Sequence, residues 1–242
     1  NGVHIRQMHS NTNKIVMLIL QTNQCFCPSK SLLRANGKTI QKLVEDLSPE
    51  LSSRIKVMNL HKLAYKICKE HGGNTQIAQK GDIAKAWSSV FNNLLNETGF
   101  KKDFICEEFQ EIVDRMGLET LDDYLTVVRK GRQRLVKNQR KLLWPYFAAF
   151  KEEINKLGQT TYEGIIQQAR TQVEQGRLPR YRYILVDELQ DFGLESLKLI
   201  SALAAVNEGN NNSLCVVGDG HQRLYSSTNI PLSHAGINVI GR

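Results

Sequence analysis

The clearest indication of the fold is the stretch Tyr183–Asp191, which reads YILVDELQD. Its four leading apolar residues include Ile and Val, which predicts a short strand buried in a sheet. Two carboxylates, Asp187 and Glu188, follow directly. Ligands of open α/β folds bind at the carboxyl ends of parallel strands, where we expect these two residues to stand. The stretch therefore predicts a parallel sheet with an acidic ligand site at its edge.

Two adjacent carboxylates in this position suit phosphate chemistry. Asp187 is expected to hold the Mg²⁺ that bridges nucleotide phosphates, usually through water. Glu188 is expected to lie at the same metal site and to orient and polarise the attacking water as a general base. Two alternatives stay open. The pair could merely complement the dipole of a following helix, or serve a nuclease, for which the sequence shows no additional metal ligands.

A second stretch, Leu214–Tyr225 (LCVVGDGHQRLY), again predicts a buried strand that runs into a Gly/Asp turn. Gly218 and Gly220 let the backbone approach a ligand closely. Gln222 is a neutral side chain that can sense a γ-phosphate or its water, and Tyr225 offers a flat face for stacking on an unpaired base. The alternative is a plain strand and turn with Tyr225 in the core.

Together the two stretches resemble motifs II and III of the UvrD/Rep-like superfamily 1 DNA helicases, which read DExQD and GDxxQxIY. Leu224 stands where that family has Ile. The resemblance implies Mg²⁺ and ATP as cofactors and DNA, in single-stranded form, as the partner. It also implies that Asp187 and Glu188 serve Mg²⁺ and hydrolysis, that Gln222 couples the nucleotide state to DNA, and that Tyr225 lies near the single strand.

Gln190 and Asp219 belong to the same two motifs and are expected to line the nucleotide site with Asp187 and Gln222. A further segment, Val57–His61 (VMNLH), resembles the family motif written TxH, which lies on the DNA side. His61 is therefore a candidate DNA-binding residue. The alternative for His61 is an ordinary polar residue at the start of a helix.

One part of the family pattern is missing. A motor of this class needs G-x-x-x-x-G-K-[ST], whose backbone amides and Lys cradle the phosphates. Val3–Arg6 resembles the strand that leads into this loop, but residues 7–14 contain no glycine. Asn36–Thr39 reads NGKT, yet Leu32 stands at the position of the first glycine, so a GKT on a helix surface is the alternative. The chain also shows neither motif IV nor a second motor domain, so we expect that it does not unwind DNA alone.

The pattern along the chain predicts an α/β fold split by helices. Strands are expected at 14–21, 54–58, 183–186 and 214–217, and a helix at 61–70 that ends at Gly72 and Gly73. From about 75 to 175 the apolar residues repeat at helical spacing, with helices at 142–157 and 162–175 among them. The predicted fold is a P-loop NTPase-like (RecA-like) parallel sheet, discontinuous in sequence, with an inserted all-helical subdomain. The motor domain would comprise 1–74 and 176–242, and the insertion 75–175.

The amino-acid composition indicates the general class of protein. The hydrophobic fraction of 41% and charged fraction of 23% are ordinary for a soluble globular protein. No apolar run approaches the ~18 residues of a membrane span, and the N-terminus shows no signal-peptide pattern. The five cysteines are scattered, which predicts reduced thiols. We therefore expect a cytoplasmic protein without a membrane partner.

The net charge of +8, with a pI near 9.3, favours a polyanionic partner such as nucleic acid. The most basic run, Arg129–Lys141 (RKGRQRLVKNQRK), can be interpreted in two ways. It could track a phosphate backbone, or form a solvated helix face with buried aliphatic stems.

The leading hypothesis is the N-terminal motor portion of an ATP-dependent DNA helicase, with nucleotide between Asp187/Glu188 and Gln222. The rival is a non-catalytic pseudo-helicase that keeps the sheet without the phosphate loop and acts as a DNA- or protein-binding module. Mg²⁺-dependent ATP binding discriminates between them.

Overall fold

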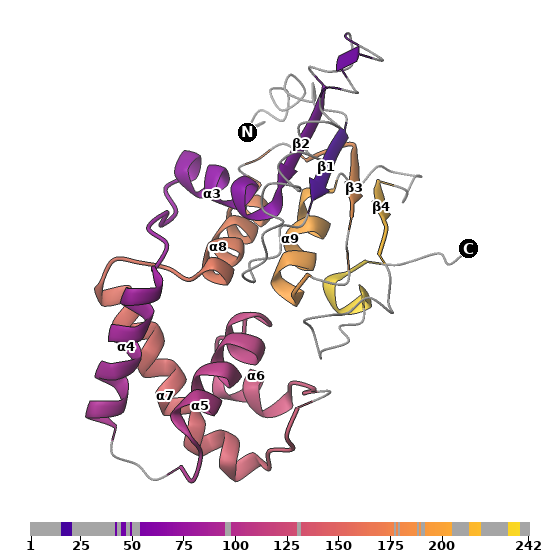
Figure 1. Ribbon diagram of the computed structural model, residues 1–242. Helices are drawn as coiled ribbons and strands as arrows, with labels where there is room; N and C mark the ends of the chain where they lie inside the picture. Colours follow the sequence, from indigo (N-terminus) through magenta and orange to yellow (C-terminus); the bar gives the residue numbers. More distant parts are fainter. Residues whose placement is uncertain are drawn as a thin grey trace, which may run out of the picture.

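Four parallel strands form a sheet around the predicted YILV strand. In the computed structural model β3 (Tyr183–Val186) pairs with β1 (Val16–Leu20) on one side and with β4 (Leu214–Val216) on the other. The remaining strand, β2 (Ile55–Asn59), pairs with β1, which gives the order β2-β1-β3-β4 (Figure 1). Because neighbouring parallel strands cannot be joined by tight turns, long connections separate them in sequence.

The described part of the chain is mixed α/β, mostly helical, with this small sheet. It comprises residues 16–20, 42, 45, 46, 49, 54–94, 98–129, 132–176, 178, 180–187, 189, 192–204, 213–218 and 232–237. All four strands predicted within it are confirmed to within two residues at each end. The expected strand Val3–Arg6 and the NGKT segment lie outside it. No helix in these residues combines the length and apolarity that crossing a membrane requires.

One face of the sheet is covered by three helices, α3 (Leu60–His71), α8 (Tyr162–Glu174) and α9 (Leu194–Leu203). Side chains alternate along a strand, so Ile184 and Val186 point into this core while Leu185, on the opposite face, is 40% exposed. Helix α8 packs between α3 and α9, as Figure 1 shows. These elements make the first hydrophobic core, next to the carboxyl edge of the sheet.

Helix α3 shows how local sequence fixes an element at that edge. Asn59 ends β2 and caps α3, because its side-chain oxygen accepts a hydrogen bond of 3.2 Å from the amide of Lys62. Gly72 ends the helix at φ +80°, a left-handed conformation that glycine adopts without strain. The predicted helix at 61–70 is therefore confirmed, and its first turn follows the carboxyl end of β2.

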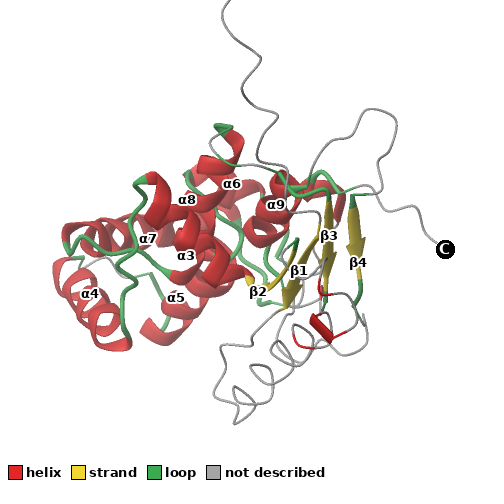
Figure 2. Ribbon diagram, turned by 90° about the horizontal axis from the view of Figure 1, so that it is seen from above, coloured by secondary structure: helices red, strands yellow, loops and turns green. Residues whose placement is uncertain are grey.

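The second core is helical and rich in aromatic side chains. It is built from α4 (Lys80–Asn93), α5 (Lys102–Glu108), a π-helix (Phe109–Asp114), α6 (Leu121–Thr126) and α7 (Lys137–Lys156). Trp87 stacks on Phe150 with ring centroids 4.2 Å apart, and Phe109 meets Phe150 edge-on at 4.7 Å. Figure 2 shows α4, α5 and α7 at the end of the molecule away from β4.

The two cores meet at the start of α9. Leu194 packs against both of them. Helix α8 shares its buried residues with α3 and α9, although the sequence pattern grouped it with the insertion at 75–175. The division of the chain at 74/75 and 175/176 stays a prediction. A short 3-10 helix, Leu232–Ala235, adds Ala235 to the first core.

Candidate nucleotide and DNA site

Asp187 and Gly218 stand at the carboxyl ends of neighbouring strands. Asp187 follows β3 directly and is exposed, and Gly218, two residues beyond β4, is exposed too. Val186 lies level with Val216 in the parallel register. The two stretches that carry the helicase-like motifs thus emerge side by side at one edge of the sheet.

Backbone hydrogen bonds tie these two strand ends together. The amide of Val217 donates to the carbonyl of Val186 at 2.8 Å, and the amide of Leu189 donates to the carbonyl of Val217 at 3.0 Å. Phe192, 3% exposed, then anchors the chain in the first core, and its amide donates to the carbonyl of Leu189 at 3.2 Å. Backbone hydrogen bonds at Leu189 and Phe192 therefore hold the chain in place just after Asp187.

Several predicted site residues lie outside the described part of the chain: Glu188, Gln190, Asp219, Gln222 and Tyr225. Their roles stay predictions. Of the predicted nucleotide-site residues, Asp187 is described, and it fits Mg²⁺ in kind, because an exposed carboxylate is the oxygen ligand that this ion prefers. Within the described residues, no group of three or more His, Cys, Asp or Glu forms a metal site. The three described cysteines, Cys68, Cys106 and Cys215, are free thiols.

His61 lies in the first turn of α3, at the same edge, but its ring is turned against the protein. It meets Tyr162, the first residue of α8, edge-on with ring centroids 5.7 Å apart. Its Nε2 is buried and has no hydrogen-bond partner among the described residues. Burial lowers the pKa of His61 to about 4, so the imidazole is neutral at pH 7. A direct contact of His61 with DNA stays a prediction.

The arginines of the basic run are used inside the helical core. Arg129, 3% exposed, binds Glu108 through Nε and Nη2, and Arg132 Nε approaches the same carboxylate at 3.2 Å. Glu108 is fully buried and also accepts a hydrogen bond of 2.9 Å from the hydroxyl of Tyr124. Arg140 Nη1 donates to the carbonyls that end α6, the nearest of them that of Tyr124 at 2.6 Å.

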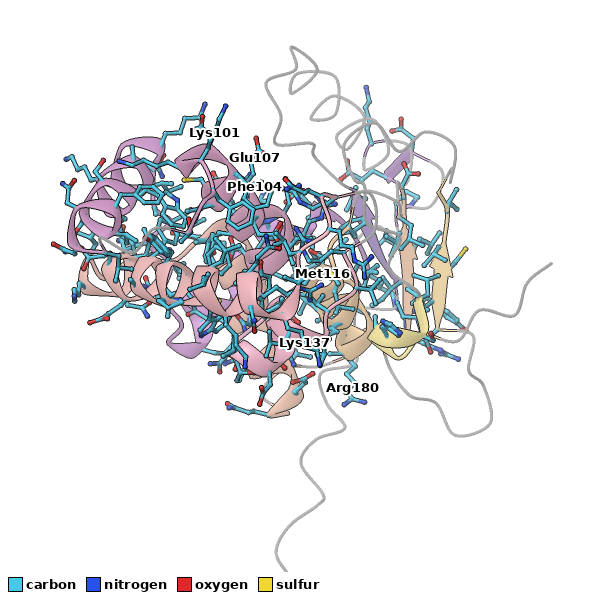
Figure 3. All side chains as sticks on the ribbon, turned by 90° about the horizontal axis from the view of Figure 1, so that it is seen from below. Lys101, Phe104, Glu107, Met116, Lys137 and Arg180 are labelled. Atoms are coloured by element: carbon cyan, nitrogen blue, oxygen red, sulfur yellow. The ribbon has the colours of Figure 1, made fainter. Side chains whose placement is uncertain are left out.

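Arg129, Arg132 and Arg140 fit neither a phosphate track nor a solvated helix face, because their guanidinium groups bind protein groups inside the helical core. The described cations of the run that remain exposed are Arg134, Lys137 and Lys141. Lys137 opens α7 at the surface (Figure 3). A phosphate track along the run would rest on these residues and not on the arginines that bind Glu108.

Sequence reasoning missed two exposed aromatic residues beside His61. Tyr65 is 41% exposed on α3, and Tyr162 is 44% exposed at the start of α8. The signal available was spacing, because Tyr65 follows His61 by four residues and thus shares its side of the helix. Tyr162 had no such signal, since only the packing of α8 on α3 brings it there.

A cluster of buried and half-buried carboxyl groups at the meeting of the two cores was also missed. Glu195, 1% exposed, is bound by Arg170 Nε and Lys198 Nζ, each at 2.8 Å. Asp114 accepts a hydrogen bond of 2.8 Å from Thr161, beside a pocket of about 360 Å³. Burial raises the pKa of Asp114 to about 6 and that of Glu163 to about 8. Carboxyl groups with raised pKa values are common at functional sites but occur in structural networks as well.

Comparisons with known proteins agree with the geometry. The family model of the UvrD/REP helicase N-terminal domain matches residues 3–228. The chain is 22% identical over 226 residues to a component of the ATP-dependent helicase/deoxyribonuclease of Clostridium tetani, covering 88% of this chain and 18% of that protein. It is 31% identical over 100 residues to DNA helicase IV of Escherichia coli, covering 41% of this chain and 14% of that protein. The chain thus spans less than a fifth of either relative, and by its family match it belongs to the UvrD/REP helicases, as their N-terminal domain.

Proposed function

We propose that this chain is the N-terminal portion of an ATP-dependent DNA helicase, which in the complete protein couples Mg-ATP hydrolysis to movement on single-stranded DNA. The observation that carries the proposal is that the segments of Asp187 and Gly218 leave the sheet side by side, at the carboxyl ends of β3 and β4. Hydrogen bonds between Leu189, Val217 and Val186 hold these ends together. Such an edge of a parallel sheet is where nucleotides bind in open α/β folds.

The proposed roles follow from the chemistry of the side chains. Bound Mg-ATP supplies the phosphoryl group that is transferred to water. Asp187 would help to hold the metal, and Glu188 would orient the attacking water and accept its proton. Gln222 would sense the γ-phosphate, while Gln190 and Asp219 would line the same site. The fold we propose for these residues is the P-loop NTPase type, with the helical core as an insertion.

Movement on DNA requires that the nucleotide site and the DNA surface be linked. His61 and Tyr225 are the proposed DNA contacts, and both belong to segments that follow strands of the sheet. His61 is separated from the end of β2 only by Leu60, and Tyr225 comes after β4 in the sequence. The rigid sheet can then carry a change at one site to the other.

A second function, the non-catalytic pseudo-helicase, is favoured by one specific observation. The sequence between Val3–Arg6 and β1 contains no glycine, whereas a phosphate loop needs two. In that case the sheet would serve as a scaffold for DNA or protein binding. The two functions differ in whether Mg-ATP stabilises the fold.

The test is a thermal unfolding titration with a non-hydrolysable ATP analogue and Mg²⁺. A ligand that binds only the folded state raises its stability with concentration, so the unfolding midpoint of the wild-type chain should rise. Asp187→Ala should cancel that rise, whereas Glu152→Ala, at an exposed carboxylate on α7, should keep it. An unchanged midpoint at millimolar analogue would favour the pseudo-helicase.

A further inference from the structure

The outer surface of α3 combines aromatic and basic side chains. Tyr65, Lys62, Lys66 and Lys69 are all exposed there, on the side opposite the buried residues of the helix. Lys66 pairs with Glu70 at 3.5 Å. Within the described residues neither Lys62 nor Lys69 has an ion pair, so both charges are available to a ligand. The surface is therefore positive, with a flat ring in its middle.

Helix α8 extends this surface with a second ring. Tyr162 lies at its first position, 44% exposed, and α8 packs directly on α3. His61 touches Tyr162 edge-on, and Tyr65 follows His61 one turn later on the same side of α3. The two exposed tyrosines thus flank one partly buried imidazole. We call Tyr65, Tyr162, Lys62 and Lys69 the α3–α8 surface.

Besides being a proposed DNA contact, His61 supports this arrangement. Its Nε2 is buried, and burial keeps the ring neutral at pH 7, so it brings no charge to the surface. An edge-on contact fixes the plane of a neighbouring ring, because the positive edge of one ring meets the negative face of the other. Tyr162 is then presented with one side held by protein and the other accessible to solvent.

We propose that the α3–α8 surface binds single-stranded DNA, with bases stacked on Tyr65 and Tyr162 and phosphates neutralised by Lys62 and Lys69. Accessible aromatic rings interleaved with lysines are what sequence-independent binding of an unpaired strand requires, since every base offers a flat face. The surface begins where β2 ends, at the same edge as Asp187. A strand bound there would lie across α3 and the start of α8.

The inference rests on the proposed function for the identity of the polyanion, but its test contains no nucleotide. DNA binding by the α3–α8 surface can therefore be tested even if the chain does not bind Mg-ATP. The probe is a fluorescently labelled oligothymidine, and the readout is anisotropy at several salt concentrations. A matched oligonucleotide of abasic sites offers the same phosphates without bases to stack.

Tyr65→Ala and Tyr162→Ala should each weaken oligothymidine binding by at least about five-fold, the lower end for loss of one stacked base. Tyr65→Phe, which keeps the ring, should stay near wild type. Leu142→Ala, at a comparably exposed apolar residue on α7, is the control and should change nothing. On the abasic strand, the tyrosine variants should match the wild type.

Lys62→Gln and Lys69→Gln should act differently from the tyrosine variants. Each should lower the slope of log affinity against log salt by about 0.7, the value for one phosphate contact on a single strand. Lys156→Gln, whose amine already binds Glu152 and Glu153, is the matched control. Equal binding of the wild type and both alanine variants to oligothymidine would overturn the proposal. So would an absence of wild-type binding at low salt, or preference for a duplex.

Discussion

Gly117 and Glu195 approach so closely that a Cβ on Gly117 would lie 2.2 Å from Cγ of Glu195. The glutamate cannot move aside freely, because Arg170 and Lys198 bind its two carboxylate oxygens. A second close contact joins the same two parts of the chain: a Cβ on Gly193, just before α9, would stand 2.7 Å from the carbonyl oxygen of Arg115. The helical core is thus fitted onto the start of α9, a few residues beyond the acidic stretch.

Gly117→Ala should therefore destabilise the protein more than its backbone conformation alone explains. Gly117 has φ +64°, and Gly158 has φ +65° with no atom within 4 Å of the point where a Cβ would stand. Both alanine variants bear the cost of a left-handed conformation, about 1 kcal/mol. Only Gly117→Ala adds a clash, which should bring its total loss to about 3 kcal/mol in denaturant unfolding. Equal losses for the two variants would show that α9 and the helical core are not held together here.

Glu108→Gln should destabilise the helical core strongly. The substitution removes the negative charge that compensates Arg129, which is 3% exposed, and leaves a buried cation without its ion pair. Loss of one partner from such a pair costs about 3 kcal/mol. The neighbour Glu107, 69% exposed on the outside of α5 (Figure 3), is the control. Glu107→Gln should change the free energy of unfolding by less than about 0.5 kcal/mol.

If both glutamate variants unfold at the same denaturant concentration as the wild type, the ion pairs and hydrogen bonds of Glu108 do not stabilise the helical core. In that case the ion pairs of Glu108 with Arg129 and Arg132 contribute little to stability. Both variants should be measured in the same denaturant, because the dependence of the unfolding free energy on denaturant concentration must be compared before the midpoints are converted to stabilities.

Glu163→Gln should make the protein relatively more stable as pH rises. Burial, with a contribution from Asp114, raises the pKa of Glu163 in the folded protein from 4.5 to about 8. Between these values the folded state binds more protons than the unfolded state, so stability from this group is present below pH 4.5 and lost as pH rises towards 8. Glutamine does not titrate and should escape the loss.

The measurement is the difference in unfolding free energy between Glu163→Gln and wild type at pH 5 and pH 8. It should shift in favour of the variant by at least about 1 kcal/mol across this range. His61, whose pKa is lowered, acts in the opposite direction, losing stability as pH falls from 6.5 towards 4, but it is present in both proteins. Glu152→Gln, at an exposed site, should show no such shift. A constant difference for Glu163→Gln would contradict the raised pKa.

Much of the fold could be predicted because local signals were strong. Apolar runs followed by polar or glycine residues predicted β3 and β4, and Gly72 predicted the end of α3. In Val57–His61, Asn59 stands where the TxH motif has Thr, and it caps α3, as Thr also can. The order of the strands and the place of α8 in the first core depend on long-range packing, which periodicity does not encode.

Side-chain partners across the chain were not predictable in the same way. The run Arg129–Lys141 looked uniformly basic, yet Glu108, a buried carboxylate in a different helix, decides what its arginines do. For the candidate site the motifs predicted which residues stand together at the sheet edge, and Asp187 lies there. That His61 turns its ring towards Tyr162 follows from the packing of α8 on α3, which no motif contains.

We propose that Asp187 belongs to a Mg²⁺-dependent nucleotide site. Calorimetric titration with a non-hydrolysable ATP analogue tests it most directly, with Mg²⁺ or with a chelator present, on wild type and Asp187→Ala. Mg²⁺ should strengthen binding to the wild type, and the substitution should remove this Mg²⁺-dependent gain. No heat at millimolar nucleotide, or equal binding by both proteins, would contradict it.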